Sequence, residues 1–157
     1  QGLSRCSSDY LGWTHADMQT DPQDILRAYE MIEKLAFPSD IYVKGRRRGR
    51  PLSDSLFTGA MSIFETCYLG MPLWDINAQP NIFHRSFFEA WTAPPHDFSL
   101  DLYAYYKARQ SKLNIVRFDV SFPPRLHGQS KWNTGLKSKL RFIKRTLDFS
   151  VKLKKLL

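Results

Sequence analysis

Two oxygen-bearing side chains in one short segment have the chemistry to hold a divalent metal ion. Asp17 and Gln19 lie within residues 14–22, which read THADMQTDP. In an extended segment, residues two apart leave the backbone on the same side, so these two side chains can meet one cation. Carboxylate and amide oxygens suit Mg²⁺ or Mn²⁺, which stabilise a diphosphate leaving group. An aspartate in a polar loop is, on composition alone, more often a helix cap or a solvated charge.

The segment lies where a predicted strand gives way to a predicted helix. Residues 10–14 are apolar and aromatic, which is typical of a short buried strand. Asp21 followed by Pro22 is the order expected of an N-cap and the first helical residue, and helical spacing of apolar residues continues to about Phe37. We therefore assign Asp21 to the cap. Ligands of open α/β sheets usually bind at the carboxyl ends of strands, which favours a metal–diphosphate site at this position.

Residues 15–22 resemble the Asp-x-Asp-x-Gln segment of family 2 glycosyltransferases, particularly those of the dolichyl- or polyprenyl-phosphate mannosyltransferase type. In that family the two aspartates and the glutamine hold the divalent cation of a sugar nucleotide. The resemblance implies that Asp17 and Gln19 bind Mg²⁺ or Mn²⁺, with His15 in the place of the first aspartate. An imidazole prefers softer metals than Mg²⁺, so the full ligand set and the metal preference stay open.

A basic run, KGRRRGR at residues 44–50, follows a predicted strand over residues 39–44 and is predicted to be a cationic loop. Taken alone, such a run is as often a solvated or nucleic-acid-binding surface. The family has a similar Lys-Gly-x-Arg segment that meets phosphate groups, and guanidinium groups match phosphate geometry. The resemblance implies this role for Arg46 or one of its neighbours.

Residues 125–131, RLHGQSK, resemble the family's flexible loop over the donor diphosphate. The resemblance implies that Arg125 and Lys131 neutralise phosphate charge. His127 is a further candidate metal ligand, although a lone histidine in a loop is more often solvated.

Residues 74–85, WDINAQPNIFHR, read as a turn followed by a short strand. The family carries a similar Asp-x-x-x-Gln-Pro-x-x-Phe segment beneath its acceptor site. The resemblance implies that Asp75 and Gln79 line that site.

Asp101 falls in the first turn of a helix predicted to run to about Gln110, where an acidic side chain suits the helix dipole. In family 2 enzymes with sugar acceptors, an aspartate at a corresponding place acts as general base. The resemblance implies that role for Asp101, with Asp97 as the second choice. A lipid-phosphate acceptor needs no base, because a phosphate monoester with a second pKa of about 6 is largely ionised at neutral pH.

Two further helices are predicted. Residues 52–69 are apolar on most sides, so this helix is either buried or lies against a membrane, and we expect burial. Residues 135–157 place lysines and arginines on one face and leucines, isoleucine and valine on the other. Such a basic amphipathic helix suits a membrane surface or a terminal helix docked on the core.

The composition bounds the class of protein. With 157 residues and 43% hydrophobic residues the chain can form one domain with a real core, and its formal charge of +8 predicts an anionic partner. Two cysteines in unrelated contexts indicate structural thiols in a reducing cytosol. No signal peptide or apolar run long enough to span a bilayer is visible, so we expect a cytoplasmic protein with at most peripheral contact at the inner face of the cell membrane.

Together these features predict an α/β protein with the Rossmann-like GT-A fold of nucleotide-diphospho-sugar transferases. The resemblance matches only the later part of that catalytic domain, in residues 1–133, so we expect a fragment without the first strand–helix units. Residues 134–157 form the basic amphipathic helix. The predicted function is metal-dependent sugar transfer from a nucleotide-sugar donor to a polyprenyl phosphate or another membrane-associated acceptor, a step typical of cell envelope biosynthesis, with no nucleic acid expected. The alternative is a non-catalytic basic module that binds nucleic acid or anionic lipid.

Overall fold

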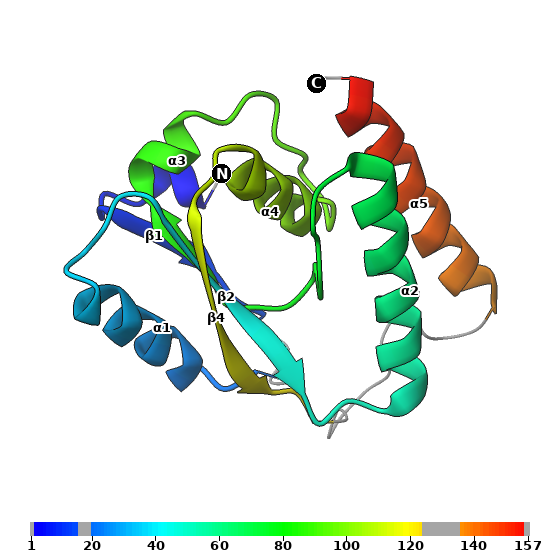
Figure 1. Ribbon diagram of the computed structural model, residues 1–157, viewed down its shortest axis with the longest axis horizontal. Helices are drawn as coiled ribbons and strands as arrows, with labels where there is room; N and C mark the ends of the chain where they lie inside the picture. The colour runs from blue at the N-terminus through cyan, green and yellow to red at the C-terminus, as the bar shows by residue number, and fades with distance from the viewer. Residues whose placement is uncertain (1, 16–19, 124–135, 156–157) are drawn as a thin grey trace.

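The computed structural model describes residues 2–15, 20–123 and 136–155. Over these residues the chain forms an α/β fold with a four-stranded mixed sheet and five α-helices (Figure 1). In chain order the elements are a 3₁₀ turn (Leu3–Arg5), β1 (Tyr10–Trp13), α1 (Gln23–Lys34), β2 (Ile41–Arg48), α2 (Leu52–Leu69), β3 (Asn81–His84), α3 (Arg85–Glu89), α4 (Leu100–Gln110), β4 (Asn114–Ser121) and α5 (Leu136–Lys155).

The strand order is β1-β3-β2-β4, with β3 antiparallel to both of its neighbours and β2 parallel to β4. It follows that β1, β2 and β4 run in one direction and end at the same edge of the sheet. Trp13 of β1 and Lys44 of β2 both lie opposite Asn81, the first residue of β3. His15, which follows β1, therefore lies at the carboxyl end of a strand, as predicted.

Side chains alternate between the two faces of the sheet, as a strand period of two requires. Tyr42 and Phe83 pack on one face in a cluster with α4, while Val43 and Ile82 pack on the other face with α1. Helix α4 is buried along most of its length. At its amino end the buried Asp101 lies close to the end of β1 and the start of β3.

Most of the predicted elements are confirmed, with small differences at their ends. The Asp21 carboxylate accepts a hydrogen bond from the backbone N–H of Gln23 at 2.9 Å, which confirms the cap of α1. This helix ends at Lys34, not near Phe37, because Ala36 and Phe37 both have positive φ angles (59° and 56°). The short helix α3 was not predicted.

The prediction of a cationic loop for the basic run was wrong for residues 44–48, which belong to a strand. Strand β2 continues to Arg48, and each of its residues from Ile41 onward is paired with a residue of β4. Gly45 allows this, because a Cβ there would lie 2.2 Å from the Gln79 carbonyl oxygen. Arg46 is thus held on a strand.

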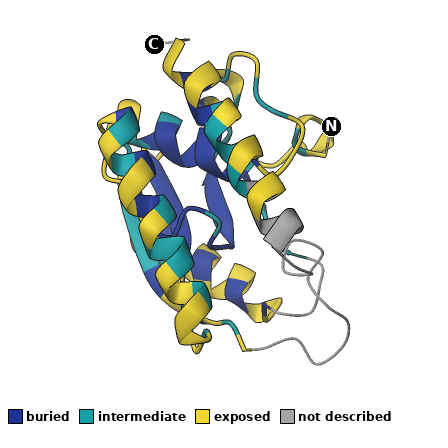
Figure 2. Cartoon of the chain, turned by 90° about the vertical axis from the view of Figure 1, so that its right-hand side faces the viewer, coloured by how far each residue is buried: buried dark blue, intermediate teal, exposed yellow. Residues whose placement is uncertain are grey.

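The expectation that α2 is buried was also wrong. The buried residues of this helix are Ser62, Glu65 and Leu69, whereas Leu56 and Ile63 are 67% and 59% exposed. Helix α2 lies at the rim of the molecule beside α5, so its outer side has no covering element among the described residues (Figures 1 and 2). A helix that is apolar on most sides cannot bury all of them at such a position.

In the part of the chain that the structure describes, no helix combines the length and the apolar character needed to cross a bilayer.

Candidate functional site

Asp101 brings three segments of the chain together at the carboxyl end of β1: β1 itself, residues 79–81 and α4. Its Oδ1 accepts hydrogen bonds from the indole N–H of Trp13 at 2.9 Å and from the Asn81 amide at 3.1 Å. The Gln79 amide nitrogen lies 3.5 Å from Oδ1 and 3.3 Å from Oδ2. The Asp101 side chain is only 5% exposed. Its position in the first turn of α4 was predicted, but these contacts go beyond an interaction with the helix dipole.

The two oxygens of Asp101 differ in what surrounds them. Oδ1 accepts two well-formed hydrogen bonds, whereas Oδ2 has only the longer contact with Gln79. Gln79 Oε1 is buried and has no hydrogen-bond partner among the described residues. Buried polar atoms are normally satisfied. Oδ2 of Asp101 and Oε1 of Gln79 can therefore each accept a hydrogen bond from a hydroxyl group.

Lys44 fixes the backbone that leads to Gln79 and Asn81. Its ammonium group is fully buried and donates to the carbonyl oxygens of Ile76 and Ala78, both at 2.7 Å, and to Asn81 Oδ1 at 3.0 Å. Burial lowers the pKa of Lys44 to about 7, with the negative charge of Asp101 acting in the opposite direction. The loop that carries the predicted acceptor-lining residues is thus attached to β2 from within the core.

Asp75 is buried among three arginines. Its carboxylate accepts hydrogen bonds from the backbone N–H of Arg47 at 2.9 Å and from Arg47 Nε at 2.8 Å, and Arg50 and Arg117 approach it at 3.9 and 3.8 Å. Burial alone raises the pKa of Asp75, but the charge and hydrogen bonds of Arg47 hold that pKa below its ordinary value. Asp75 therefore holds the three guanidinium groups together, and its carboxylate is not free to bind a ligand.

Arg46 lies on the exposed side of β2. Arg46 and Arg48 both form ion pairs with Asp119 of β4, and their side chains are 45% and 60% exposed. Two guanidinium groups thus share one carboxylate at the edge where β2 and β4 end. This leaves a net positive charge that is accessible to an anion, as the predicted role of Arg46 requires.

The metal-binding prediction falls mostly outside the described residues. Asp17 and Gln19 are not described, and His15 is half-buried two residues after Trp13. The side chains of Thr14 and Thr20, which flank them, lie within 3.4 Å of each other. The described residues contain no group of three or more His, Cys, Asp or Glu side chains that could hold a metal ion.

The remaining predicted site residues lie in two places. Arg125, Lys131 and His127 are outside the described residues. Asp97 is exposed, accepts a hydrogen bond from the backbone N–H of Ser99 at 2.9 Å and lies 3.6 Å from Arg145. It therefore supports the start of α4 and does not belong to the Asp101 network.

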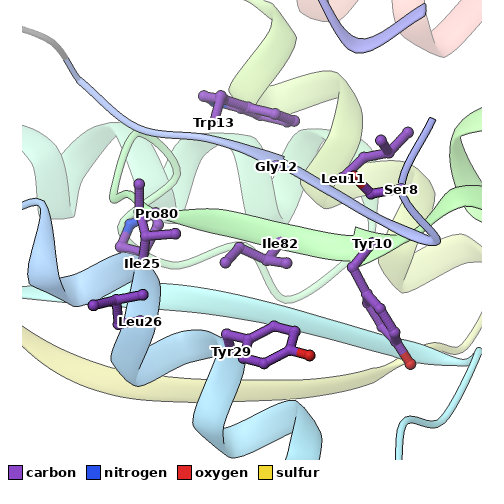
Figure 3. A pocket seen from close by; sticks show the side chains of 10 residues that line it. All are labelled: Ser8, Tyr10, Leu11, Gly12, Trp13, Ile25, Leu26, Tyr29, Pro80 and Ile82. Carbon is purple, nitrogen blue, oxygen red and sulfur yellow. The ribbon is translucent and has the colours of Figure 1, made fainter. Parts of the chain in front are cut away.

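A cavity among the described residues lies on the other face of the sheet. It has a volume of about 460 Å³ and is bounded by β1, Ile82 and the side of α1 that carries Ile25, Leu26 and Tyr29 (Figure 3). Its lining is apolar and contains no charged side chain. We therefore place the candidate site at Asp101 and the arginines, not at this cavity.

Sequence reasoning missed Trp13, Lys44 and Asn81 as site residues. Each carries a weak signal, because Lys44 and Asn81 are polar residues beside apolar strand positions and Trp13 directly precedes the metal segment. A polar side chain in an apolar strand has to find partners inside the protein. That rule could have marked Lys44 and Asn81 as members of a buried network.

No known protein family matches the sequence, and no curated protein matches it.

Proposed function

We propose that the chain belongs to a family 2 glycosyltransferase catalytic domain of GT-A fold. It would transfer a sugar from a nucleotide-sugar donor to a polyprenyl phosphate or another membrane-associated acceptor. The observation that supports this most is the meeting of separate segments at Asp101. Trp13, Gln79 and Asp101 are distant in sequence and lie within or beside segments that resemble the family, yet their side chains are in hydrogen-bonding contact.

The leaving group of such a reaction is a nucleoside diphosphate, which needs positive charge. Arg46 and Arg48 place exposed guanidinium groups at the end of β2, where only Asp119 opposes them among the described residues. Asp17 and Gln19, with His15, would hold the divalent cation, which when bound would stabilise the departing diphosphate. Arg125 and Lys131 would add charge from the following segment.

The acceptor decides what Asp101 does. For a hydroxyl acceptor, Oδ2 of Asp101, which has only the longer contact with Gln79, would take the proton, while Gln79 Oε1 would accept a hydrogen bond from the substrate. For a lipid phosphate no base is required, and Asp101 would serve to hold Trp13 and residues 79–81 in place. In both cases the three arginines around Asp75 place fixed positive charge beside the loop that carries Gln79.

Calorimetry with three probes tests the diphosphate site: UDP, GDP and inorganic pyrophosphate, each with and without Mn²⁺. We expect binding that requires the metal and that falls at least about tenfold in Asp17→Ala, because the cation loses its carboxylate ligand. Asp21→Asn is the matched control, since it alters a nearby aspartate but preserves a good N-cap. Pyrophosphate reports the site without relying on recognition of a base.

The opposite outcome is equally specific. If the chain binds DNA or RNA without metal, with a steep dependence on salt and no effect of Asp17→Ala, it is a basic binding module and not a glycosyltransferase.

A further inference from the structure

Helix α2 has the reverse of the usual arrangement for a helix at the rim of a protein. Its exposed side carries an apolar stripe with steps of four, four, three and four residues, and the side toward the protein buries Ser62 and Glu65. At 3.6 residues per turn these steps keep the stripe on one face. The stripe consists of Leu52, Leu56, Ala60, Ile63 and Cys67, with Phe64 beside it.

The large apolar side chains of this stripe are unusually exposed to solvent. Leu52, Leu56 and Ile63 are 76%, 67% and 59% exposed, and Phe64 is 40% exposed. Single exposed leucines are ordinary on protein surfaces, but a contiguous apolar stripe along one helix usually marks a binding surface.

Helix α5 lies beside α2 and presents its own exposed residues on the same side of the molecule (Figure 2). The two helices are joined by Ser150, which donates to both carboxylate oxygens of Glu65 at 2.7 and 2.8 Å. Lys154 adds a hydrogen bond to the carbonyl oxygen of Tyr68 at 2.7 Å. The two helices therefore form one connected surface.

The charge of α5 identifies the kind of partner. This helix contains eight lysines and arginines and one acidic residue, Asp148. Basic residues recur on its exposed side within about a quarter of the helix circumference. Four of these basic residues, all exposed, are Arg141, Lys144, Lys152 and Lys155.

We propose that this surface, which we call the α2–α5 face, lies on an anionic lipid bilayer. The apolar stripe of α2 enters the interface, and the basic residues of α5 lie at the level of the lipid phosphates. Apolar and cationic residues side by side are the combination that an anionic membrane surface binds. A purely apolar protein partner would not use the charges, and a nucleic acid would not use the stripe.

This inference deepens the proposed function, because it gives the orientation in which a membrane-associated acceptor would reach the chain. The contacts that carry it are independent of the metal segment and of the Asp101 network. Its failure can therefore be distinguished from failure of the proposed function.

Co-sedimentation with vesicles of phosphatidylcholine, with and without phosphatidylserine, tests the α2–α5 face. We expect binding that depends on phosphatidylserine and that falls at least about tenfold in Leu56→Ser/Ile63→Ser, since each buried aliphatic side chain contributes that much. Lys144→Gln and Lys152→Gln should each reduce binding by about fivefold. Leu26→Ser is the matched control, because Leu26 of α1 is 63% exposed but lies outside this face.

The two cysteines provide a second measurement. Both are free and exposed, and Cys67 lies on the stripe while Cys6 does not. An environment-sensitive fluorophore on Cys67, in a Cys6→Ser background, should shift to the blue when anionic vesicles are added. The same fluorophore on Cys6, in a Cys67→Ser background, should not shift.

Three results would overturn the proposal. The first is vesicle binding that Leu26→Ser and Leu56→Ser/Ile63→Ser change equally. The second is self-association of the wild-type chain without lipid that Leu56→Ser/Ile63→Ser abolishes, since the stripe would then bind a second copy. The third is the absence of vesicle binding in a chain that still binds pyrophosphate with Mn²⁺, which would leave the proposed function intact and remove the membrane surface.

Discussion

Asp75 and Glu65 are both buried carboxylates, but the fold drives their ionisation in opposite directions. Asp75 lies among guanidinium groups, and Arg47 holds its pKa below the ordinary value despite burial. Among the described residues, Glu65 is hydrogen-bonded to the Ser150 hydroxyl, and burial raises its pKa to about 7 against the weaker opposing effect of that hydrogen bond. Burial alone therefore does not decide the charge of a carboxylate; the charge of its partners does.

The difference matches the position of the two residues. Asp75 belongs to the candidate site, where a permanent negative charge orders a cluster of positive groups. Glu65 belongs to the contact between α2 and α5, where a proton can bind or leave at neutral pH. The charge of Asp75 is thus expected to stay constant over a pH range in which the α2–α5 contact changes.

The largest expected effect is that of Asp75→Asn. Removing this carboxylate leaves Arg47, Arg50 and Arg117 close together without their shared counter-charge, so the free energy of unfolding should fall by about 3–5 kcal/mol. Urea denaturation at neutral pH measures this. Because the folded pKa of Asp75 is lowered, its contribution is present above the unfolded pKa near 3.8 and is lost as pH falls through the folded value.

Asp119→Asn is the control for Asp75→Asn. Its carboxylate pairs with Arg46 and Arg48 at the surface, where solvent screens the charges, so the loss of stability should be much smaller than that of Asp75→Asn. Equal losses in the free energy of unfolding of the two variants would mean that the burial of Asp75 among arginines adds nothing to its stabilising effect.

The next effect is that of Asp101→Asn. The neutral amide oxygen is a weaker acceptor for Trp13 and Asn81, and the amide NH2 group faces the Gln79 NH2 group as a second donor, so we expect a loss of about 1–3 kcal/mol in the free energy of unfolding. Trp13 fluorescence should change, because its indole N–H then donates to an uncharged oxygen. An unchanged spectrum and stability would contradict the central position that we give to Asp101.

The smallest effect of the three is that of Glu65→Gln, and it depends on pH. Folding takes up a proton at Glu65 between pH 4.5 and about 7, so the stability that this proton provides is complete below 4.5 and is lost as pH rises through 7. At pH 8 the glutamine variant should therefore be more stable than the wild type by about 1–2 kcal/mol. Below pH 4.5 the two should agree.

Urea denaturation across this pH range measures the difference, with Glu33→Gln on the exposed side of α1 as the control. Parallel stability curves for wild type and Glu65→Gln would show that folding does not shift the pKa of Glu65.

Local periodicity was enough to predict most of the elements, because each element has to match its own apolar spacing. It placed β1, β4 and α4 close to their observed bounds, and it assigned Asp21 to the cap of α1. It failed where a neighbour decides the outcome. Arg46 and Arg48 look like loop residues in sequence, yet they continue β2 because β4 pairs with them.

The candidate site, too, was predicted only in part from the sequence. The family resemblance indicated Asp75, Gln79 and Asp101 from sequence, but not which of them touch. The roles proposed for Asp17, Gln19, Arg125 and Lys131 remain predictions, because these residues lie outside the described part of the chain. The network around Asp101 depends on contacts across up to 88 positions in sequence, which no local pattern encodes.

The sequence by itself determined the alternation of strands and helices, the helix cap at Asp21 and the excess of positive charge. Only the tertiary structure decided which polar residues are buried and which apolar residues are not. Lys44 and Glu65 enter the core because the fold gives them hydrogen-bond partners, and Leu56 and Ile63 stay outside because no described element covers α2. Whether a side chain is buried depends on the elements that pack around it, and these are fixed only when the whole chain is folded.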